Sequence, residues 1–418
     1  MGAGEMDIFG LLYEPIKLEA SQEKPIKIGT LFSGIGCPEM SMKKITNNYE
    51  VVFRSEIDKY PNMTYKEIHG DILNLGDVEL IQEIPYVDIL HLSPPCQDLS
   101  KAGKQKGLGK GTRSGLMYEV IRILKNTKEK PKVVTMEQVP DLIQETFKHH
   151  WARFHRMMED LGYKVYANVL NAKNYGVAQN RDRLYMVAVL GDYSYEFPQW
   201  VTLDKRLKDY LEDKVDEKYY LSASFIEAMY KPSGNFNRAE RFEQSTHKNP
   251  EESVAFTITS RAGERPTDNF IAETICMNSK VNGKQPSLQD RIYDIDGVST
   301  TVTTSFMPSI AIPEATKQGY ALAHDGDGVY LNRPHQKRGV VQDQMIQTVK
   351  TSGDDIRVVT SDLRIRKLTP LEVWRLMGIS DQDYYKAQSV CSNSQLYKQA
   401  GNGIVIDVFE AILRRMIE

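Results

Sequence analysis

The chain has 418 residues, enough for two or three domains with substantial hydrophobic cores. Hydrophobic residues make up 41% and charged residues 26%, a composition that is ordinary for a globular protein and argues against wholesale disorder. The 53 basic and 56 acidic residues give a net charge of −3, which taken alone speaks mildly against nucleic-acid binding.

The sequence predicts neither a membrane-spanning helix nor a secretory signal peptide. No stretch reaches the roughly 18 consecutive apolar residues of a membrane helix, and the acidic N-terminus lacks the basic segment of a signal peptide. The cysteines Cys37, Cys96, Cys276 and Cys391 are scattered and form no C-x-x-C pair. We therefore expect a protein of the reducing cytoplasm.

The first half of the chain alternates between two kinds of pattern. Short apolar runs that predict buried strands lie at 27–32, 51–56, 87–93, 132–137 and 183–189. Helical periodicity occurs at 114–128 and at 141–162, where Asp141 is a candidate cap and Gly162 a candidate end. Alternating strands and helices predict an α/β fold with a doubly wound, mostly parallel sheet.

From about residue 197 to 361 the sequence becomes rich in Gly, Pro, Ser, Thr and Asn, which favours a smaller β-rich insertion. Three segments within it, 255–263, 299–307 and 346–354, share a Thr-aliphatic-polar core. A degenerate repeat of strand-and-turn units and a shared composition of Thr/Val-rich strands explain this similarity equally well.

Helical signals return near the C-terminus. Thr369 can cap a helix that starts at Pro370, Glu372 completes a capping box, and Gly378 ends the helix. The tail from residue 401 opens on a Gly-Asn-Gly turn and continues as an apolar-faced helix. We expect a first domain at 25–196, an inserted domain at 197–378, and a return to the first domain at 379–418.

Ligands of doubly wound sheets bind beyond the carboxyl ends of the strands, so the residues that follow each strand are candidates. The first strand is followed by a glycine turn at 33–36, the second by Glu56 and Asp58, and Asp71 stands in the motif HGDI. A backbone turn and carboxylates in this order suit an adenosine-containing ligand. Taken singly, a solvated acid and a turn-forming Asp explain the carboxylates equally well, and a merely tight turn is the less frequent explanation of the glycines.

The third strand is followed by Pro94-Pro95-Cys96, with a glycine-rich cationic loop behind it. An isolated cysteine is usually an inert buried side chain, but neighbouring cations lower a thiol's pKa and favour a nucleophile. The loop itself is a candidate mobile lid for phosphates, or else a solvated surface loop. Its cations are Lys101, Lys104, Lys106, Lys110 and Arg113.

Two further strands supply a carboxyl group and two guanidinium groups. Glu137 ends the fourth strand, and Arg181 and Arg183 point to one side where the last strand begins. A cysteine, a carboxyl group and an arginine are a suitable set for attack on an electron-poor pyrimidine ring.

The order of these motifs closely resembles the DNA (cytosine-5)-methyltransferase family of bacteria and phages. The matching segments follow the family order along nearly the whole chain: LFSGIG, SEID, GDI, SPPCQ, RSGLMYE, MEQV, QNRDR, RKLTPLEVWRLMG and QAGNGIVI. The resemblance implies methyl transfer from S-adenosylmethionine to C5 of cytosine in duplex DNA, with Cys96 attacking C6 of a base turned out of the helix.

The resemblance also assigns residues to roles. Glu137 would bind N3 and the amino group of cytosine, with Arg183, helped by Arg181, supporting that contact. The implied cofactor residues are Phe32, Ser33, Gly34, Gly36, Glu56, Asp71, Ile72, Pro95, Leu116, Asn402 and Ile404. The implied DNA contacts are Gln97, Ser100, Lys101, Lys104, Lys106, Lys110 and Arg113. The inserted domain would recognise the target sequence, and no metal is expected.

Two positions depart from the family pattern, and other functions remain open. Gln138 replaces the usual Asn and keeps its amide, whereas Ile57 replaces a frequent aromatic residue. A tRNA methyltransferase of the same fold and a catalytically silent binding module are the alternatives. The expected role is restriction–modification or phage DNA protection by a monomer in a bacterial or phage-infected cell, with a separate cognate endonuclease as an optional partner.

Overall fold

The structure is a computed structural model, and it describes residues 13–21, 24–95, 115–220, 310–313, 320–330, 341–349, 357–360 and 365–417. The chain divides into two compact units. Unit 1 consists of Met1–Lys205 and Val373–Glu418, and unit 2 of Arg206–Glu372. The similar segments 255–263 and 299–307 lie outside the described residues, so the repeat stays a prediction.

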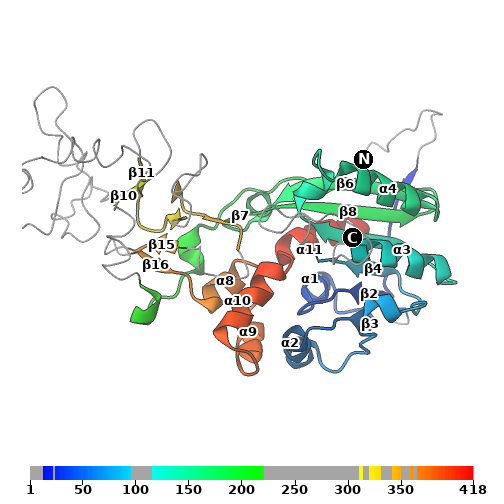
Figure 1. Ribbon diagram of the computed structural model, residues 1–418, viewed down its shortest axis with the longest axis horizontal. Helices are drawn as coiled ribbons and strands as arrows, with labels where there is room; N and C mark the ends of the chain where they lie inside the picture. The colour runs from blue at the N-terminus through cyan, green and yellow to red at the C-terminus, as the bar shows by residue number, and fades with distance from the viewer. Residues whose placement is uncertain are drawn as a thin grey trace, which may run out of the picture. The chain divides into compact units, whose positions relative to one another are not determined.

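Unit 1 is built around a mixed sheet with the strand order β3-β2-β4-β5-β8-β6 (Figure 1). Its strands are β2 (Ile26–Leu31), β3 (Tyr49–Ser55), β4 (Ile89–Leu92), β5 (Val133–Gln138), β6 (Tyr163–Asn171) and β8 (Asp182–Leu190). The first four strands in this order are parallel, whereas β8 runs antiparallel to both β5 and β6. The predicted α/β fold is confirmed.

Strand β6 was not among the predicted strands. It lies at the edge of the sheet and carries exposed residues at its centre, Ala167, Asn168 and Val169. The apolar runs that reveal the central strands arise from burial on both faces. Strand β3 lies at the other edge, but its second half, Phe53–Ser55, is buried and carries part of such a run. Strand β6 exposes its centre, which is why composition alone did not reveal it.

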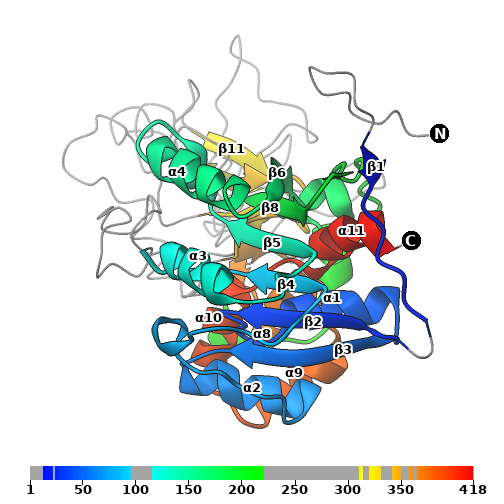
Figure 2. The same ribbon diagram turned by 90° about the vertical axis from the view of Figure 1, so that its right-hand side faces the viewer.

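Helices cover both faces of this sheet (Figure 2). They are α1 (Cys37–Ile45), α2 (Lys59–His69), α3 (Leu116–Asn126), α4 (Lys148–Glu159), α9 (Asp381–Gln388), α10 (Asn393–Asn402) and α11 (Ile406–Ile417), with α8 (Pro370–Arg375) at the junction of the two units. On one face, Leu90 and Leu92 share a buried core with residues of α3 and α4. On the other face, the ring of His91 contacts Phe409 of α11 at 4.7 Å between centroids.

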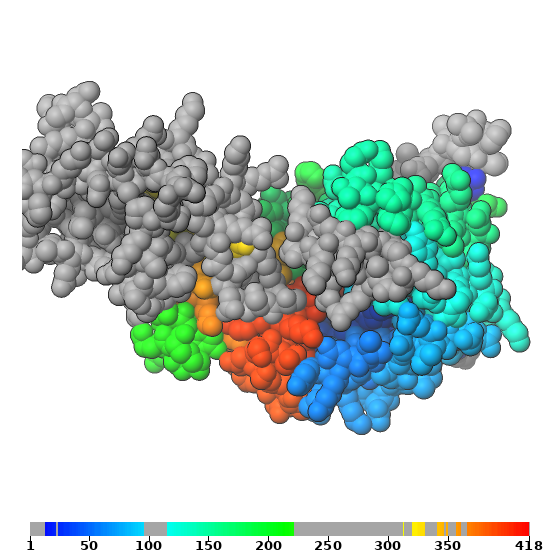
Figure 3. Space-filling view, viewed as in Figure 1, coloured from blue at the N-terminus to red at the C-terminus, as the bar shows by residue number. Residues whose placement is uncertain are grey.

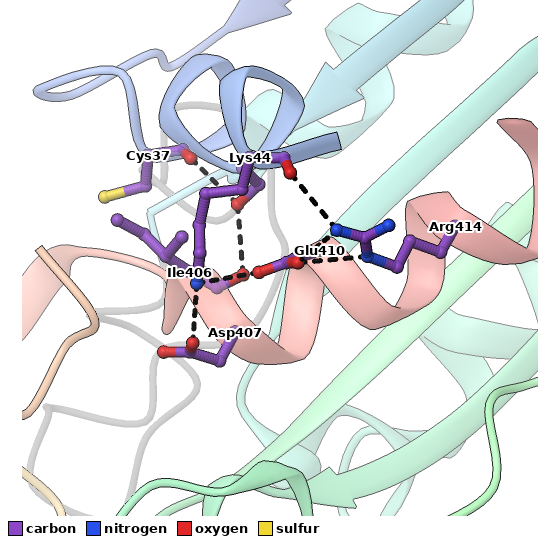
Figure 4. A network of polar contacts seen from close by, with 7 residues as sticks. Cys37, Lys44, Ile406, Asp407, Glu410 and Arg414 are labelled. Carbon is purple, nitrogen blue, oxygen red and sulfur yellow. Dashed lines mark hydrogen bonds and ion pairs between the residues drawn. The ribbon is translucent and has the colours of Figure 1, made fainter. Parts of the chain in front are cut away.

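The C-terminal helix α11, red in Figure 1, lies beside α1, blue near the start of the chain. Ser41 Oγ donates hydrogen bonds of 3.1 Å to the carbonyl oxygens of Cys37 and Ile406 (Figure 4). Lys44 Nζ lies 2.7 Å from both Asp407 and Glu410. These contacts join the two ends of the chain into one unit.

The N-terminal segment, which has no counterpart in the family motifs, is also part of unit 1. Strand β1 (Glu14–Pro15) pairs in parallel with β9 (Tyr193–Ser194). Leu18 is buried, and its backbone N–H donates to the carbonyl of Met416 at 2.6 Å. Residues 13–18 therefore run along the same end of the unit as α11.

The helix predicted at 141–162 is shorter than expected. Residues Pro140–Ile143 form a 3₁₀ turn, α4 starts only at Lys148, and Asp141 is not its cap. The capping box of α8 is present as predicted: the N–H of Thr369 donates to Glu372 at 2.8 Å, and the N–H of Glu372 donates to the Thr369 hydroxyl at 3.3 Å.

Unit 2, as far as it is described, consists of short strands. They are β10 (Ile310–Pro313), β11 (Tyr320–Ala323), β12 (Gly328–Val329), β13 (Val341–Gln342), β14 (Ile346–Gln347), β15 (Arg357–Val359) and β16 (Ile365–Lys367). Strands β13, β12, β15 and β16 form an antiparallel sheet in that order. A buried ion pair of 2.8 Å joins Arg366 to Glu372.

The remaining short elements are η1 (Val78–Leu80), η3 (Pro140–Ile143), η4 (Ala172–Tyr175), β7 (Gln179–Asn180), η5 (Leu207–Tyr210) and η6 (Glu217–Tyr219). Within the described ranges, no helix combines the length and the apolar composition needed to cross a membrane.

Candidate functional site

A cavity of about 280 Å³ opens at the carboxyl edge of the parallel strands in unit 1. Its walls come from the residues that follow β2, β3, β4 and β5, together with the end of α10 and the turn behind it. The predicted residues that it brings together are Phe32, Ser33, Gly34, Glu56, Pro95, Leu116, Glu137, Arg181, Arg183, Asn402 and Ile404.

The turn after β2 forms one wall with an unusual backbone. Phe32 has a φ of 58°, and Gly34 one of 55°. Ser33 between them is buried, and its hydroxyl has no hydrogen-bond partner among the described residues. A buried hydroxyl on a cavity wall is a group that a polar ligand can satisfy.

Backbone N–H groups hold the Glu56 carboxylate in place. Oε2 accepts a hydrogen bond of 3.0 Å from Gly34, and Oε1 accepts bonds of 2.8 and 2.7 Å from Ile57 and Asp58. The carboxylate is thus fixed at the cavity wall and keeps acceptor capacity for two hydroxyl groups of a ribose.

Three predicted cofactor residues do not line the cavity: Gly36, Asp71 and Ile72. The Asp71 side chain is 82% exposed and lies 3.3 Å from Lys66. The chain then pairs with β3, because the Arg54 N–H donates to Leu73 and the Leu75 N–H donates to Arg54. Only after this paired segment does the chain reach the carboxyl edge of the sheet.

Gly76, Asp77 and Val78 line the cavity where Asp71 was expected. The sequence contains two Gly-Asp-aliphatic motifs, at 70–72 and at 76–78, and the prediction names only the first. Asp77 accepts a bond of 3.0 Å from the N–H of Glu79, which leaves further acceptor capacity on its carboxylate. The repeated motif was the sequence signal that could have identified it.

Gly36 has a packing role. Its φ is 84°, and a Cβ at this position would come within 2.3 Å of His69 Nε2 and 2.8 Å of the Tyr65 ring. Glycine therefore lets the turn approach α2 closely.

Glu137 and Arg183 form an ion pair in the cavity wall. Arg183 Nε lies 2.9 Å from Glu137 Oε1, and the two side chains are 16% and 10% exposed. Such a pair fixes the carboxylate's orientation while leaving its second oxygen available to a substrate.

Arg181 points to the C-terminal turn. Its Nη2 donates to the carbonyl oxygens of Gly401 and Gly403 at 3.2 and 2.8 Å. These carbonyls flank Asn402, so Arg181 positions the turn that completes the cavity.

Gln138 connects β5 to the segment that precedes Cys96. Its Nε2 donates to the Pro94 carbonyl at 3.0 Å, and its Oε1 accepts the N–H of Val139 at 2.9 Å. The retained amide thus fixes the end of β4. Cys96 itself and the predicted DNA contacts Gln97, Ser100, Lys101, Lys104, Lys106, Lys110 and Arg113 lie outside the described residues.

A second cysteine, Cys37, lines the cavity but is unsuited to nucleophilic attack. Burial raises the pKa of its thiol to about 12, so the thiolate is scarcely populated at neutral pH.

His91 also lines the cavity, and it is uncharged at neutral pH. Its Nδ1 lies 2.9 Å from Thr135 Oγ1, and its Nε2 lies 2.9 Å from Ser93 Oγ. Burial lowers the pKa of His91 to about 3, so the ring orients Ser93 as a neutral group.

Helix α10 supplies polar groups that sequence reasoning did not identify. Lys398 Nζ pairs with Asp58 Oδ2 at 2.8 Å, and Gln395 has a buried Oε1 without a hydrogen-bond partner among the described residues. Both line the cavity. Together with Ser33, they give the cavity a polar lining.

Comparisons with known proteins identify the family of the chain. The model of the C-5 cytosine-specific DNA methylase family matches residues 26–418. The orphan methyltransferase M.Rho11sI of Bacillus phage rho11s is 30% identical over 94% of this chain and 98% of its own length. The type II methyltransferase M2.ScrFI of Lactococcus lactis subsp. cremoris is 28% identical over 88% of this chain and 78% of its own length.

Solved structures share the fold at lower sequence identity. The methyltransferase EhMeth of Entamoeba histolytica has a TM-score of 0.52 and 15% identity, and covers 94% of this chain and 98% of its own. A DNMT2 mutant of Spodoptera frugiperda has a TM-score of 0.51 and 18% identity, and covers 93% of this chain and 99% of its own. On its motifs, its cavity and the match over residues 26–418, the chain belongs to the C-5 cytosine-specific DNA methylase family and is a methyltransferase.

Proposed function

We propose that this enzyme transfers a methyl group from S-adenosylmethionine to C5 of cytosine in specific sequences of duplex DNA, through covalent attack by Cys96. The observation that carries the proposal is the single cavity whose walls hold both the Glu56 carboxylate and the Glu137–Arg183 pair. Methyl transfer requires the donor and the cytosine to be bound in the same cavity. The residues that bind the donor and those that bind the base must therefore line one cavity.

Different cavity residues would bind different parts of S-adenosylmethionine. Glu56 would bind the ribose hydroxyls, and Asp77 the exocyclic amine of adenine beside the apolar Ile57 side chain. The turn at 32–35, with Asn402, would surround the amino-acid end. When bound, the donor supplies an electrophilic methyl group, which becomes attached to C5 of the base.

The chain's own groups activate the cytosine. The Cys96 thiolate forms a bond to C6, while Glu137 hydrogen-bonds N3 and the amino group and so stabilises charge on the ring. Arg183 holds Glu137 in the required orientation. Loss of the C5 proton then restores the ring and releases the Cys96 sulfur.

Unit 2 is proposed to recognise the target sequence, and the glycine-rich loop after Cys96 to contact the DNA backbone. The relatives in phages and in Lactococcus carry names of orphan and type II methyltransferases. They support a role in phage DNA protection or restriction–modification. We further propose that the enzyme acts as a monomer in a bacterial or phage-infected cell, with or without a separate endonuclease.

Labelled donor, incubated with duplex DNA or with tRNA, tests the proposal. We expect label in duplex DNA at C5 of cytosine, and none after Cys96→Ser, because a serine hydroxyl is a far poorer nucleophile at neutral pH. The variant should bind the donor with unchanged affinity, since Cys96 acts on the base. Label confined to tRNA, or full activity of Cys96→Ser, would refute the proposal.

A further inference from the structure

Helix α4 presents a cationic stripe to solvent. His149, Arg153 and Arg156 occupy positions i, i+4 and i+7, and all three side chains are exposed. We call these three residues the α4 stripe. The opposite face of the helix, with Phe154 and Met158, is buried against the sheet.

The two arginines of the α4 stripe are not paired with the acids near the helix. Glu145 pairs with Lys148, Glu159 lies 3.3 Å from His155, and Asp160 is exposed where the helix ends. Among the residues that the structure describes, neither Arg153 nor Arg156 forms an ion pair with a carboxylate. The stripe therefore offers two guanidinium groups without a carboxylate partner, on a protein whose total charge is −3.

Helix α3 holds part of this surface in place. The Arg153 guanidinium lies over the Tyr118 ring, 4.9 Å from its centroid, and the Tyr118 hydroxyl lies 3.2 Å from His150 Nδ1. Tyr118 is in the first turn of α3, next to Leu116 in the cavity wall. A guanidinium that is already oriented loses less conformational entropy on binding.

The α4 stripe starts at the edge of the sheet that carries the candidate site. Strand β5 ends with Glu137 and Gln138, η3 follows, and α4 begins at Lys148. Helices α3 and α4 lie side by side on one face of the sheet (Figure 2), and side chains of α4 form part of the molecular surface (Figure 3). An anion bound to the stripe would therefore lie along the face that leads away from the cavity.

We propose that the α4 stripe binds phosphate groups of the DNA backbone beside the methylated base, without reading sequence. This proposal rests on the proposed function. The stripe extends over about 10 Å of helix, the axial length of about three base pairs. Guanidinium groups match phosphate oxygens in geometry, and a base turned out of the duplex needs its flanking backbone held.

The test measures the affinity for unrelated duplex sequences as a function of salt concentration. Each phosphate contact removed lowers the slope of log K against log[salt] by about 1 and, at low salt, weakens binding roughly tenfold. We therefore expect Arg153→Gln/Arg156→Gln to lower the slope by about 2 on every sequence, with unchanged donor affinity. Arg153→Lys, which keeps the charge, should retain most of the binding.

Lys125→Gln is the matched control, because Lys125 is an exposed cation in the last turn of the neighbouring helix α3. It should leave both slope and affinity unchanged. If the wild type methylates duplex DNA and the double variant keeps its full slope, the stripe proposal is overturned and the proposed function stands. If the wild type methylates no duplex DNA, both fail.

Discussion

Asp71 and Asp77 stand in nearly identical local sequences, and the fold separates them. Asp71 is largely exposed, whereas Asp77 lines the cavity because the residues between them pair with β3. Local motifs specify the chemistry of a group, but the pairing of residues 73–75 with a strand decides which copy reaches the site.

We expect Asp77→Ala to weaken donor binding by roughly tenfold or more, because one hydrogen bond to a charged group contributes about 1.5–3 kcal/mol. Asp71→Ala should change donor affinity less than about twofold. Titration calorimetry with S-adenosylmethionine compares the two variants, and thermal unfolding shows whether the loss of the Asp77 cap on η1 disturbs the fold. A larger effect at Asp71 would contradict the assignment of Asp77.

His91 makes stability depend on pH. Its pKa is about 3 in the folded protein and 6.5 for an ordinary histidine, so protonation favours the unfolded chain. The free energy of unfolding should fall as the pH drops below 6.5, by up to about 1.4 kcal/mol per pH unit from this group. His91→Gln should flatten the dependence between pH 6.5 and 4.5 in urea unfolding, whereas the exposed His149→Gln should not; equal slopes for the two variants would contradict this role.

At the level of secondary structure, Gly36 shows how a turn and a helix depend on each other. Gly36 and Gly176 have φ values of 84° and 83°, but only Gly36 lacks room for a side chain. The strain of a positive φ is common to both positions, so any difference between their variants reports the contact with α2.

Gly176→Ala should destabilise unit 1 by about 1–2 kcal/mol through backbone strain alone. We expect Gly36→Ala to lower the free energy of unfolding by about 1–3 kcal/mol more than Gly176→Ala does, because its methyl group displaces His69 and Tyr65. Denaturant midpoints of the two variants give the comparison directly. If both variants lose the same free energy of unfolding, α2 makes room for the added methyl group without a free-energy cost, which would contradict this prediction.

The sequence predicted the strands that carry an apolar run, including the edge strand β3, and missed the edge strand β6, whose centre is exposed. It also predicted the capping box of α8, because Thr369 and Glu372 interact within one turn. Contacts between residues far apart in the sequence could not be predicted. Arg181 was expected to assist Arg183, and the structure adds that it donates to carbonyl oxygens more than 200 residues away in the chain. Local pattern reveals local contacts, whereas long-range pairs require the fold.

Across the whole molecule, unit 1 is assembled from two separated segments. The unit boundaries at 205/206 and 372/373 differ by nine and six residues from the predicted 196/197 and 378/379. The recognition role of the inserted segment stays a prediction. Helix α11 contributes buried apolar side chains to unit 1: Ile406, Val408, Phe409, Ile412, Leu413 and Met416.

A chain that ends at residue 405 should therefore fail to fold. Six buried apolar side chains contribute roughly 9–18 kcal/mol, which matches or exceeds the usual 5–15 kcal/mol stability of a domain. We expect loss of cooperative thermal unfolding and of donor binding in the truncated chain. Arg415→Ala, which removes only the exposed pair with Glu196, should retain both; a truncated chain that binds donor would contradict the dependence on α11.

The position of residues 395–404 in the cavity wall has a consequence for synthesis on the ribosome. The first wall of the cavity is translated early, but the last wall emerges only after the 206–372 insertion, which takes about 10–30 s at ordinary elongation rates. During that interval the nascent chain exposes the partners of α10 and α11, and its cavity lacks one wall. If the cavity binds the donor as proposed, a chain that stops before residue 395 should bind no donor.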